Sequence, residues 1–280
     1  MGRDALVEAE LVRASVDPGR GGADRRGDRR LSSLLDLSVA APGGIERGKA
    51  VEKIVVFTGA GVSAESGLKT FRDMGGLWGE YAIEDVASPA GWKRNPAVVL
   101  DFYNERRKAV LAARPNAAHE AIARLEEQFD VVVVTQNVDD LHERAGSSKI
   151  IHVHGEILKA RSSIDASLVH VLDKPRIELG ELCGKGSQLR PDIVWFGENV
   201  RHMDECAEHF AEASRVITIG TSLTVYPAAG LVEKAPWRAE KYLVSPEPQE
   251  IPYGFKFLRG AAATVVPQVV KCWLEGRKPV

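Results

Sequence analysis

Short apolar runs alternate with amphipathic stretches from residue 54 to the C-terminal end of the chain. The runs are rich in β-branched residues and lie at Ile54–Phe57, Val131–Val134, Ile150–Val153, Arg215–Ile219 and Tyr242–Val244. Continuous runs of this kind are typical of parallel strands that are buried on both faces. Strands that alternate with helices at this spacing predict an α/β fold built on a doubly wound parallel sheet.

Helical patterns occupy several intervals between these runs. One helix is predicted to begin at Asn95-Pro96 and to end near Ala113, a second spans Asn116–Phe129, and a third spans about Val266–Glu275. The stretch Lys159–Ser187 is polar and has no clear period. Two stretches, 74–114 and 156–190, interrupt the strand–helix alternation, so we expect them to form a smaller second lobe made of two insertions.

Arg106 lies within the apolar face of the first predicted helix. That face carries Val99, Phe102, Tyr103 and Val110 at helical spacing. An arginine in this place either extends its charged end along the surface or lies in a pocket that binds an anion. The pattern alone leaves both interpretations open.

A glycine loop, Gly59-Ala60-Gly61, follows the first strand, and the pair Phe71-Arg72 comes shortly after it. Glycines let the backbone approach a phosphate closely, and a helix that begins just after them offers unpaired N–H groups to an anion. The loop therefore indicates a nucleotide site. An ordinary strand-to-helix turn is the alternative for so short a motif.

Polar side chains follow two other strands. Gln136, Asn137 and Asp139 come after Val131–Val134, and Gly220-Thr221-Ser222 comes after Arg215–Ile219. Ligands of open α/β sheets bind at the carboxyl ends of the strands. The sequence therefore predicts that these residues and the glycine loop share one site.

Two histidines and an aromatic segment are further candidates. The alternation of a strand places His152 and His154 on one face. As a metal pair they would need further ligands, and a structural role is the alternative. The segment Ile193–Glu198 is predicted to be an exposed edge to which a peptide adds as a strand.

Composition narrows the class of protein. The net charge is −2 and the hydrophobic content is 44%, without the basic excess of nucleic-acid-binding proteins. No apolar run has the length of a membrane span. Cys183, Cys206 and Cys272 are far apart in the sequence, which suits a reducing compartment, so we expect a cytoplasmic protein.

Residues 1–48 differ from the rest of the chain. They contain a Gly/Arg/Asp cluster, Gly19–Arg30, and acidic and basic residues in similar numbers. This balance argues against a transit peptide. We expect a disordered extension at 1–48 and a catalytic domain at 49–280.

Five ordered motifs together resemble the sirtuin family of NAD-dependent protein-lysine deacylases. The motifs are Gly59–Gly67 with Phe71-Arg72, Thr135–Asp139, His154-Gly155, Val194–Glu198 and Gly220–Ser222. The resemblance covers the chain from about Lys49 to its end and implies a Rossmann-like sheet. It also implies an enzyme that binds NAD as a co-substrate and acyl-lysine proteins as substrates, with no membrane or nucleic-acid partner.

The resemblance assigns roles to individual residues. Binding of NAD falls to these residues: Gly59, Ala60, Gly61, Phe71, Arg72, Gln136, Asn137, Asp139, Gly220, Thr221, Ser222, Ser245, Glu247 and Ala262. Ser245 stands where the family usually has an asparagine. Catalysis is assigned to His154 with Asn137 and Asp139, and His154 is the expected base that removes a proton from a ribose hydroxyl.

The resemblance also bears on the acyl group. Tyr103 and Arg106 resemble the Tyr-x-x-Arg pair of the sirtuin class that prefers acidic acyl groups, and Ala87 resembles its small pocket residue. This favours the anion-pocket interpretation of Arg106. Substrate binding is further assigned to Val194, Trp195, Phe196 and Gly197.

One departure from the family concerns metal. Most sirtuins hold a structural zinc with four cysteines, but between His154 and Trp195 this chain has only Cys183, and Ser162 stands about where the first cysteine is expected. His170 adds at most a second ligand. We therefore expect no zinc and a lobe held by apolar contacts of Leu168, Val169, Val171, Leu172, Ile177 and Leu179.

These observations predict a deacylase that removes succinyl, malonyl and acetyl groups and releases nicotinamide and O-acyl-ADP-ribose. The alternatives on the same fold are a protein ADP-ribosyltransferase and an NAD glycohydrolase. An alternative of another class is an NAD-binding module without turnover.

Overall fold

The computed structural model describes residues 51–70, 77–78, 81–247 and 250–279. A parallel sheet of six strands, in the order β11-β10-β9-β1-β4-β5, forms its centre. The strands are β1 (Lys53–Thr58), β4 (Asp130–Thr135), β5 (Ile150–His152), β9 (Arg215–Ile219), β10 (Glu240–Ser245) and β11 (Lys256–Arg259). Because the order runs outward in both directions from β1, the predicted doubly wound α/β fold is confirmed.

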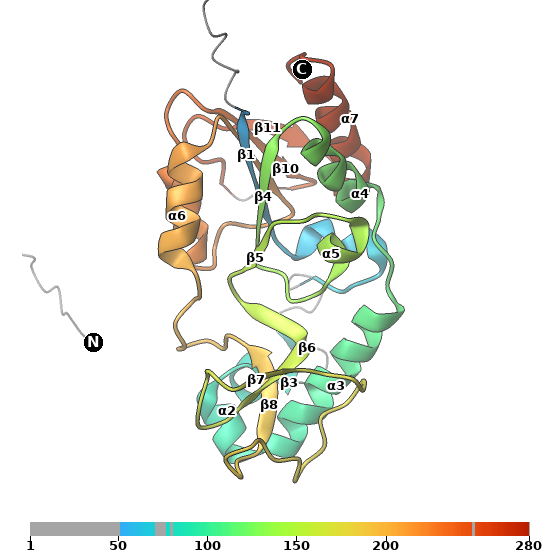
Figure 1. Cartoon of the computed structure of the whole chain (residues 1–280), viewed down its shortest axis with the longest axis vertical. Helices are drawn as coiled ribbons and strands as arrows, with labels where there is room; N and C mark the ends of the chain where they lie inside the picture. The colour runs from blue at the N-terminus through green and yellow to red at the C-terminus, as the bar shows by residue number, and fades with distance from the viewer. Residues whose placement is uncertain (1–50, 71–76, 79–80, 248–249, 280) are drawn as a thin grey trace, which may run out of the picture. The chain divides into compact units, whose positions relative to one another are not determined.

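Alternate residues of β1 face two separate cores. Ile54 and Val56 pack with residues of α4 (Ala117–Arg124) and α7 (Ala262–Leu274). Val55 and Phe57 pack with residues of α6 (Met203–Glu212), where the Phe57 and Phe210 ring centroids lie 5.8 Å apart. Figure 1 shows α6 on one side of the sheet and α4 with α7 on the other. Burial on both faces explains why the strands read as unbroken apolar runs.

A smaller, antiparallel sheet in the order β7-β6-β8 lies apart from the parallel one (Figure 1). Its strands are β6 (Gly155–Ser162), β7 (Val169–Val171) and β8 (Leu189–Ile193). The neighbouring helices are α1 (Ile83–Val86), α2 (Pro89–Arg94) and α3 (Pro96–Ala112), and a two-stranded ribbon pairs β2 (Leu77–Trp78) with β3 (Tyr81–Ala82). The two stretches assigned to a second lobe supply most of these elements.

The helix α3 begins as its sequence predicts. The Asn95 side chain accepts a hydrogen bond from Val98 N at 3.2 Å, and Pro96 is the first helical residue. The predicted apolar face, Val99, Phe102, Tyr103 and Val110, is buried. This face packs against β6 and β8 through Ile157 and Ile193.

The remaining helices are short. They are α5 (Leu141–Ala145) and the 3₁₀ turns η1 (Ala60–Val62), η2 (Ala64–Ser66), η3 (Leu125–Glu127) and η4 (Ala228–Lys234). The pattern did not reveal α5, α6 or β11, and α7 begins four residues earlier than predicted and contains Pro267. Among the described residues, we find no helix with the length and apolar character needed to cross a membrane.

Three interpretations of the second lobe were wrong in part. The stretch Lys159–Ser187 is not wholly irregular, because it contains the second half of β6 and all of β7. Ile193–Glu198 is not an exposed edge: β8 ends at Ile193, Trp195 is buried, and Glu198 N donates to Trp195 O to close a turn. Of the expected lobe core, Ile177 is buried and Leu172 packs against its cluster. Val169, Val171 and Leu179 are exposed.

Candidate active site

Four loops meet at the carboxyl edge of the parallel sheet. They follow β1, β4, β5 and β9, which are neighbours in the sheet. Thr221 Oγ1 donates to Gln136 Oε1 at 2.8 Å, which joins the loops after β9 and β4. Gly61 N donates to Gly220 O at 2.8 Å, which joins the loops after β1 and β9. The predicted convergence of the motifs is therefore present.

The glycines of the first loop are required by protein packing. A Cβ on Gly61 would lie 2.6 Å from Gly220 Cα, and one on Gly59 would lie 2.7 Å from Thr221 Cβ. Gly220 also has φ +63°, a conformation that favours glycine. The expected free N–H groups are not found at Gly59 and Gly61, because their amides donate to Ile219 O and Gly220 O. Only short 3₁₀ turns follow, and Phe71 and Arg72 lie outside the described residues.

Ser63 links Asn137 and Asp139, the two residues assigned to catalysis beside His154. Nothing in the sequence indicated this role beyond the place of Ser63 in the loop. Its hydroxyl accepts from Asn137 Nδ2 and donates to Asp139 Oδ2, both at 3.1 Å. All three side chains are buried. Burial raises the pKa of the Asp139 carboxyl, although hydrogen bonds from Leu141 N and Ser63 oppose the shift. The loops after β1 and β4 are thus fixed to each other through side chains.

Two buried histidines lie behind Ser63. Asn116 N donates to His119 Nδ1 at 3.3 Å, and the His119 and His142 ring centroids are 4.9 Å apart. Burial lowers the pKa of His119 to about 4 and lowers that of His142 well below its usual value. Both rings are therefore neutral at pH 7 and belong to the support of the site.

His154 is held in the form that a base requires. Its Nδ1 lies 3.1 Å from the Gln136 carbonyl oxygen, and since a carbonyl only accepts, Nδ1 carries the proton. Burial lowers the pKa of this imidazole, so the ring is neutral at pH 7. The Nε2 atom then has an unprotonated lone pair.

His152 also reaches the Gln136–Asn137 segment, but its environment differs. Nδ1 donates to the Asn137 carbonyl at 3.1 Å, and Nε2 lies 2.6 Å from Glu143 Oε1. Burial opposes a charge on this ring, but the hydrogen bond and ion pair with Glu143 outweigh it and raise the pKa of His152. The two histidines therefore have opposite preferences for the proton.

A buried aromatic group adjoins this edge. Tyr103, Ala87 and Trp195 belong to one apolar cluster, and Trp195 Nε1 donates to the Tyr103 hydroxyl at 3.0 Å. Burial raises the pKa of Tyr103 to about 12. Burial also lowers the pKa of Arg106, while the charges of Tyr103 and Asp139 oppose that shift. Arg106 is half-buried, and its guanidinium carbon lies 5.6 Å from the Phe102 ring centroid.

The segment after β8 connects this group to His154. Val194 N donates to His154 O at 2.9 Å, and Phe196 N donates to Ala87 O at 3.0 Å. Phe196 is half exposed and Gly197 has φ +91°. Direct contacts therefore join Ala87 and Tyr103 to the segment Val194–Gly197.

Trp195 is held by charges that the sequence did not single out. The Arg190 guanidinium carbon lies 3.1 Å from the Trp195 ring centroid. Glu198 accepts from Arg190 Nη1 at 2.7 Å and from Trp195 N at 2.9 Å. Cation–π contact and a charged hydrogen bond thus fix the indole that contacts Tyr103.

The residues assigned to the adenosine half lie at the ends of β9 and β10. Ser245 is buried and its carbonyl accepts from Gly260 N at 3.2 Å. Glu247 is exposed and lies 3.8 Å from Arg259 Nη2. Ser222 Oγ lies 2.7 Å from Thr224 Oγ1. Ala262 is the first residue of α7 and not a loop residue, and Ala263 N beside it donates to Glu65 Oε2 at 2.6 Å.

Comparison with known protein families shows which family this chain belongs to. The sequence model of the Sir2 family matches residues 59–227. This chain belongs to the Sir2 family.

Relatives of known sequence and structure agree with that assignment. An NAD-dependent protein deacylase of Bacteroides thetaiotaomicron is 52% identical over 203 residues, which are 71% of this chain and 87% of that protein. A Sir2 homolog–NAD complex is 36% identical with a TM-score of 0.72, over 81% of this chain and 91% of that one. A Sir2 complex with a deacetylated p53 peptide and 3′-O-acetyl ADP ribose is 28% identical to this chain, with a TM-score of 0.67. The match covers 79% of this chain and 93% of that one.

The four-cysteine zinc site implied for most Sir2 proteins does not fit the side chains of this lobe. Cys183 Sγ donates to Ser162 Oγ at 3.3 Å, so a serine stands beside the cysteine where a second thiolate would be needed. His170 is exposed on β7. Within the described residues, the one cluster of three potential metal ligands contains no cysteine. These donors do not make a tetrahedral structural site.

Proposed function

We propose that this Sir2 protein is an NAD-dependent protein-lysine deacylase that removes succinyl and malonyl groups and also acetyl groups. The products would be free lysine, nicotinamide and O-acyl-ADP-ribose. Deacylase activity is supported by the names of the relatives and by the peptide complex among the solved structures. The acyl preference is our own inference from the buried aromatic group.

The state of the Tyr103 hydroxyl is the observation that carries this preference. Because the Trp195 indole can only donate, it uses a lone pair of the hydroxyl, and the Tyr103 proton is left to donate to another acceptor. A pKa of about 12 keeps that proton in place at pH 7. Tyr103 is therefore a hydrogen-bond donor with a fixed direction, which suits a carboxylate.

Arg106 supplies the matching charge. It follows Tyr103 by one helical turn on α3, and the charges of Tyr103 and Asp139 both raise the pKa of its guanidinium against the effect of burial. A guanidinium and a phenol donor together bind a carboxylate by charge-assisted hydrogen bonds. Ala87, buried in the same cluster, leaves room for the longer acyl chain. An acetyl group offers no such carboxylate.

His154 is the proposed general base. Its protonated Nδ1 is occupied by the Gln136 carbonyl, so Nε2 is the atom that accepts a proton from a ribose hydroxyl. Asn137 and Asp139 are held by Ser63 and would line the nicotinamide end of the pocket. Bound NAD supplies the nicotinamide leaving group and the ribose that receives the acyl group. Gly220, Thr221, Ser222 and Ser245 would hold its adenosine half.

Transfer of ADP-ribose to protein and plain hydrolysis of NAD use the same pocket. Neither reaction requires the Tyr103–Arg106 pair, which favours deacylation. A module that binds NAD without turnover has no use for a neutral imidazole whose second nitrogen is available as a base.

The test is incubation of the full chain with NAD and matched acetyl-, succinyl- and malonyl-lysine peptides. We expect O-acyl-ADP-ribose of the corresponding mass from each peptide, with the acidic acyl groups removed fastest. NAD without peptide should be consumed much more slowly. Equal NAD consumption with and without peptide would instead identify a glycohydrolase.

A further inference from the structure

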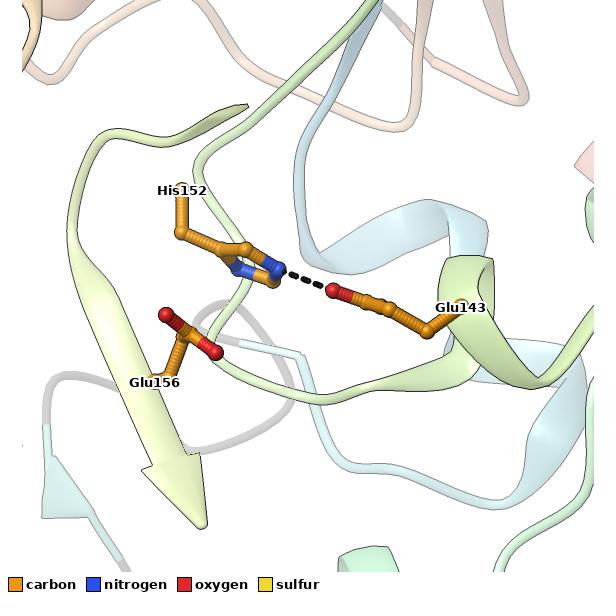
Figure 2. A group of neighbouring side chains, drawn as sticks. All are labelled: Glu143, His152 and Glu156. Atoms are coloured by element: carbon orange, nitrogen blue, oxygen red, sulfur yellow. Dashed lines mark hydrogen bonds and ion pairs between the residues drawn. The ribbon is translucent and has the colours of Figure 1, made fainter. Parts of the chain in front are cut away.

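Three side chains that the proposed reaction does not use converge beside the active-site loop. Glu143 belongs to α5, His152 ends β5 and Glu156 belongs to β6 (Figure 2). Each presents one potential ligand atom, and the three atoms lie within 4.8 Å of one another. They come from separate elements, so the fold and not a local sequence motif brings them together.

His152 is oriented as an imidazole ligand of a metal is. Its Nδ1 donates to the Asn137 carbonyl at 3.1 Å, which directs Nε2 toward Glu143 Oε1 at 2.6 Å (Figure 2). Metal-bound histidines usually donate their second ring nitrogen to a carbonyl or carboxylate in this way. The His152 side chain is only 8% exposed, so its ring direction is fixed.

The two carboxylates have the freedom to close on an ion. The Glu143 side chain is 40% exposed and that of Glu156 is 30% exposed. Tetrahedral ligands at about 2.0–2.1 Å from zinc lie roughly 3.3 Å apart, so rotation of these glutamates closes the remaining gap. The three residues line a cavity of about 250 Å³ with Val138 and Leu158, which has room for an ion and water.

Other charges surround the cluster. Lys159 Nζ donates to Glu156 Oε1 at 2.6 Å and is itself partly exposed, so it can turn toward solvent when an ion arrives. Asp139 and Asp140 line the same cavity. Arg201, His202 and Glu205 line an adjoining cavity on the other side of His152 and Glu156. Arg201 is paired with Asp192, which limits its repulsion of a cation.

We propose that Glu143, His152 and Glu156 form a binding site for one divalent transition-metal ion such as Zn²⁺, completed by water. The ion takes the place of the proton on His152 Nε2, which is released to solvent. One imidazole nitrogen and two carboxylate oxygens suit first-row ions, whereas Mg²⁺ and Ca²⁺ prefer oxygen ligands alone. The site is distinct from His154, whose ring contacts Gln136. The bound ion would join α5 to β6 and so tie the parallel sheet to the second lobe.

The test uses the full chain after chelation, with ZnCl₂ as the probe. Equilibrium dialysis with metal analysis is expected to give one ion per chain that excess Mg²⁺ does not displace. Because the ion binds only the folded chain, Zn²⁺ is also expected to raise Tm. The variants His152→Gln and Glu156→Gln are each expected to bind Zn²⁺ at least about tenfold more weakly. They should also lose the Tm increase.

Two controls keep the result specific. Glu205→Gln removes a carboxylate from the adjoining cavity, and Cys183→Ser removes the buried thiol; both are expected to bind Zn²⁺ as the parent does. If His152→Gln does not fold, the Zn²⁺ affinity of Glu156→Gln is the deciding measurement. The Glu156 side chain is partly exposed, so its replacement should leave the fold intact. The proposal is overturned if the parent binds no Zn²⁺, if both cluster variants bind it unchanged, or if Cys183→Ser abolishes binding.

Discussion

The Trp195 indole donates a hydrogen bond to the Tyr103 hydroxyl, 3.0 Å away and fully inside the protein. This contact joins the segment after β8 to α3 and sets the direction of the phenol proton. Arg190 and Glu198 hold the indole from its other side. The aromatic group of the second lobe is therefore a chain of directed contacts and not only an apolar cluster.

Tyr103→Phe tests this contact. The change leaves the buried Trp195 N–H without its acceptor, so we expect a loss of about 1–3 kcal/mol in the free energy of unfolding. Desuccinylation should fall more than deacetylation, because only the acidic acyl group uses the phenol proton. Urea unfolding and kcat/KM on matched peptides measure the two effects. In a Trp195→Phe background the stability loss should be much smaller, and an equal loss there would contradict the coupling.

His154→Tyr tests the base. We expect the fold to persist, with an unchanged circular dichroism spectrum, and formation of O-acyl-ADP-ribose to stop. His152→Gln is the matched comparison, since that ring contacts the next carbonyl of the same segment and should leave turnover measurable. A fully active His154→Tyr protein would rule out the proposed mechanism.

Cys183→Ser tests the interpretation of the second lobe. A structural zinc contributes on the order of 10–16 kcal/mol, so loss of a true ligand would unfold the lobe. In this chain the thiol donates to Ser162 and its sulfur accepts from Lys185 N, and a serine hydroxyl can replace both bonds. We expect less than about 1.5 kcal/mol of lost stability and unchanged turnover. Collapse of the lobe in this variant would indicate a metal site that the described residues do not reveal.

The neutral His119 predicts a stability that falls in acid. Its pKa is about 4 in the folded protein and near 6.5 when unfolded, so between these values the unfolded chain binds the extra proton. The contribution of the neutral, buried ring to the free energy of unfolding is fully present above about pH 6.5 and is lost as the pH falls. At pH 4 the loss is about 3 kcal/mol. Urea unfolding of the parent and of His119→Gln between pH 7 and pH 4 measures it. Identical pH slopes in the two proteins would contradict this account.

The parallel sheet could be predicted because its strands are buried on both faces. Val131–Val134 and Arg215–Ile219 contain few or no polar breaks, and the loops that follow them carry the polar residues of the site. The meeting of these loops follows from the parallel order alone. The reason for glycine at positions 59 and 61 could not be predicted from the sequence, because only the structure shows Gly220 and Thr221 packed against them.

The second lobe was hidden by its buried charges. Arg161 lies inside β6 and Arg190 inside β8, where Glu198 and Asp192 neutralise them. A strand with paired internal arginines shows no alternation of apolar and polar residues, so the pattern indicated an irregular segment. Ser63 was missed for a similar reason: a small hydroxyl gains its importance from Asn137 and Asp139, which are distant in sequence.

The most direct test of the central claim is the ratio of kcat/KM for succinyl- and acetyl-lysine peptides in the parent and in Arg106→Met. Methionine keeps the length of the side chain and removes the charge that interacts electrostatically with Tyr103 and Asp139. We expect the parent to favour the succinyl peptide. The ratio should fall roughly tenfold to a hundredfold in the variant, since a hydrogen bond to a charged group contributes about 1.5–3 kcal/mol. An unchanged ratio, with both activities reduced equally, would contradict the assignment of Arg106 to the acyl carboxylate.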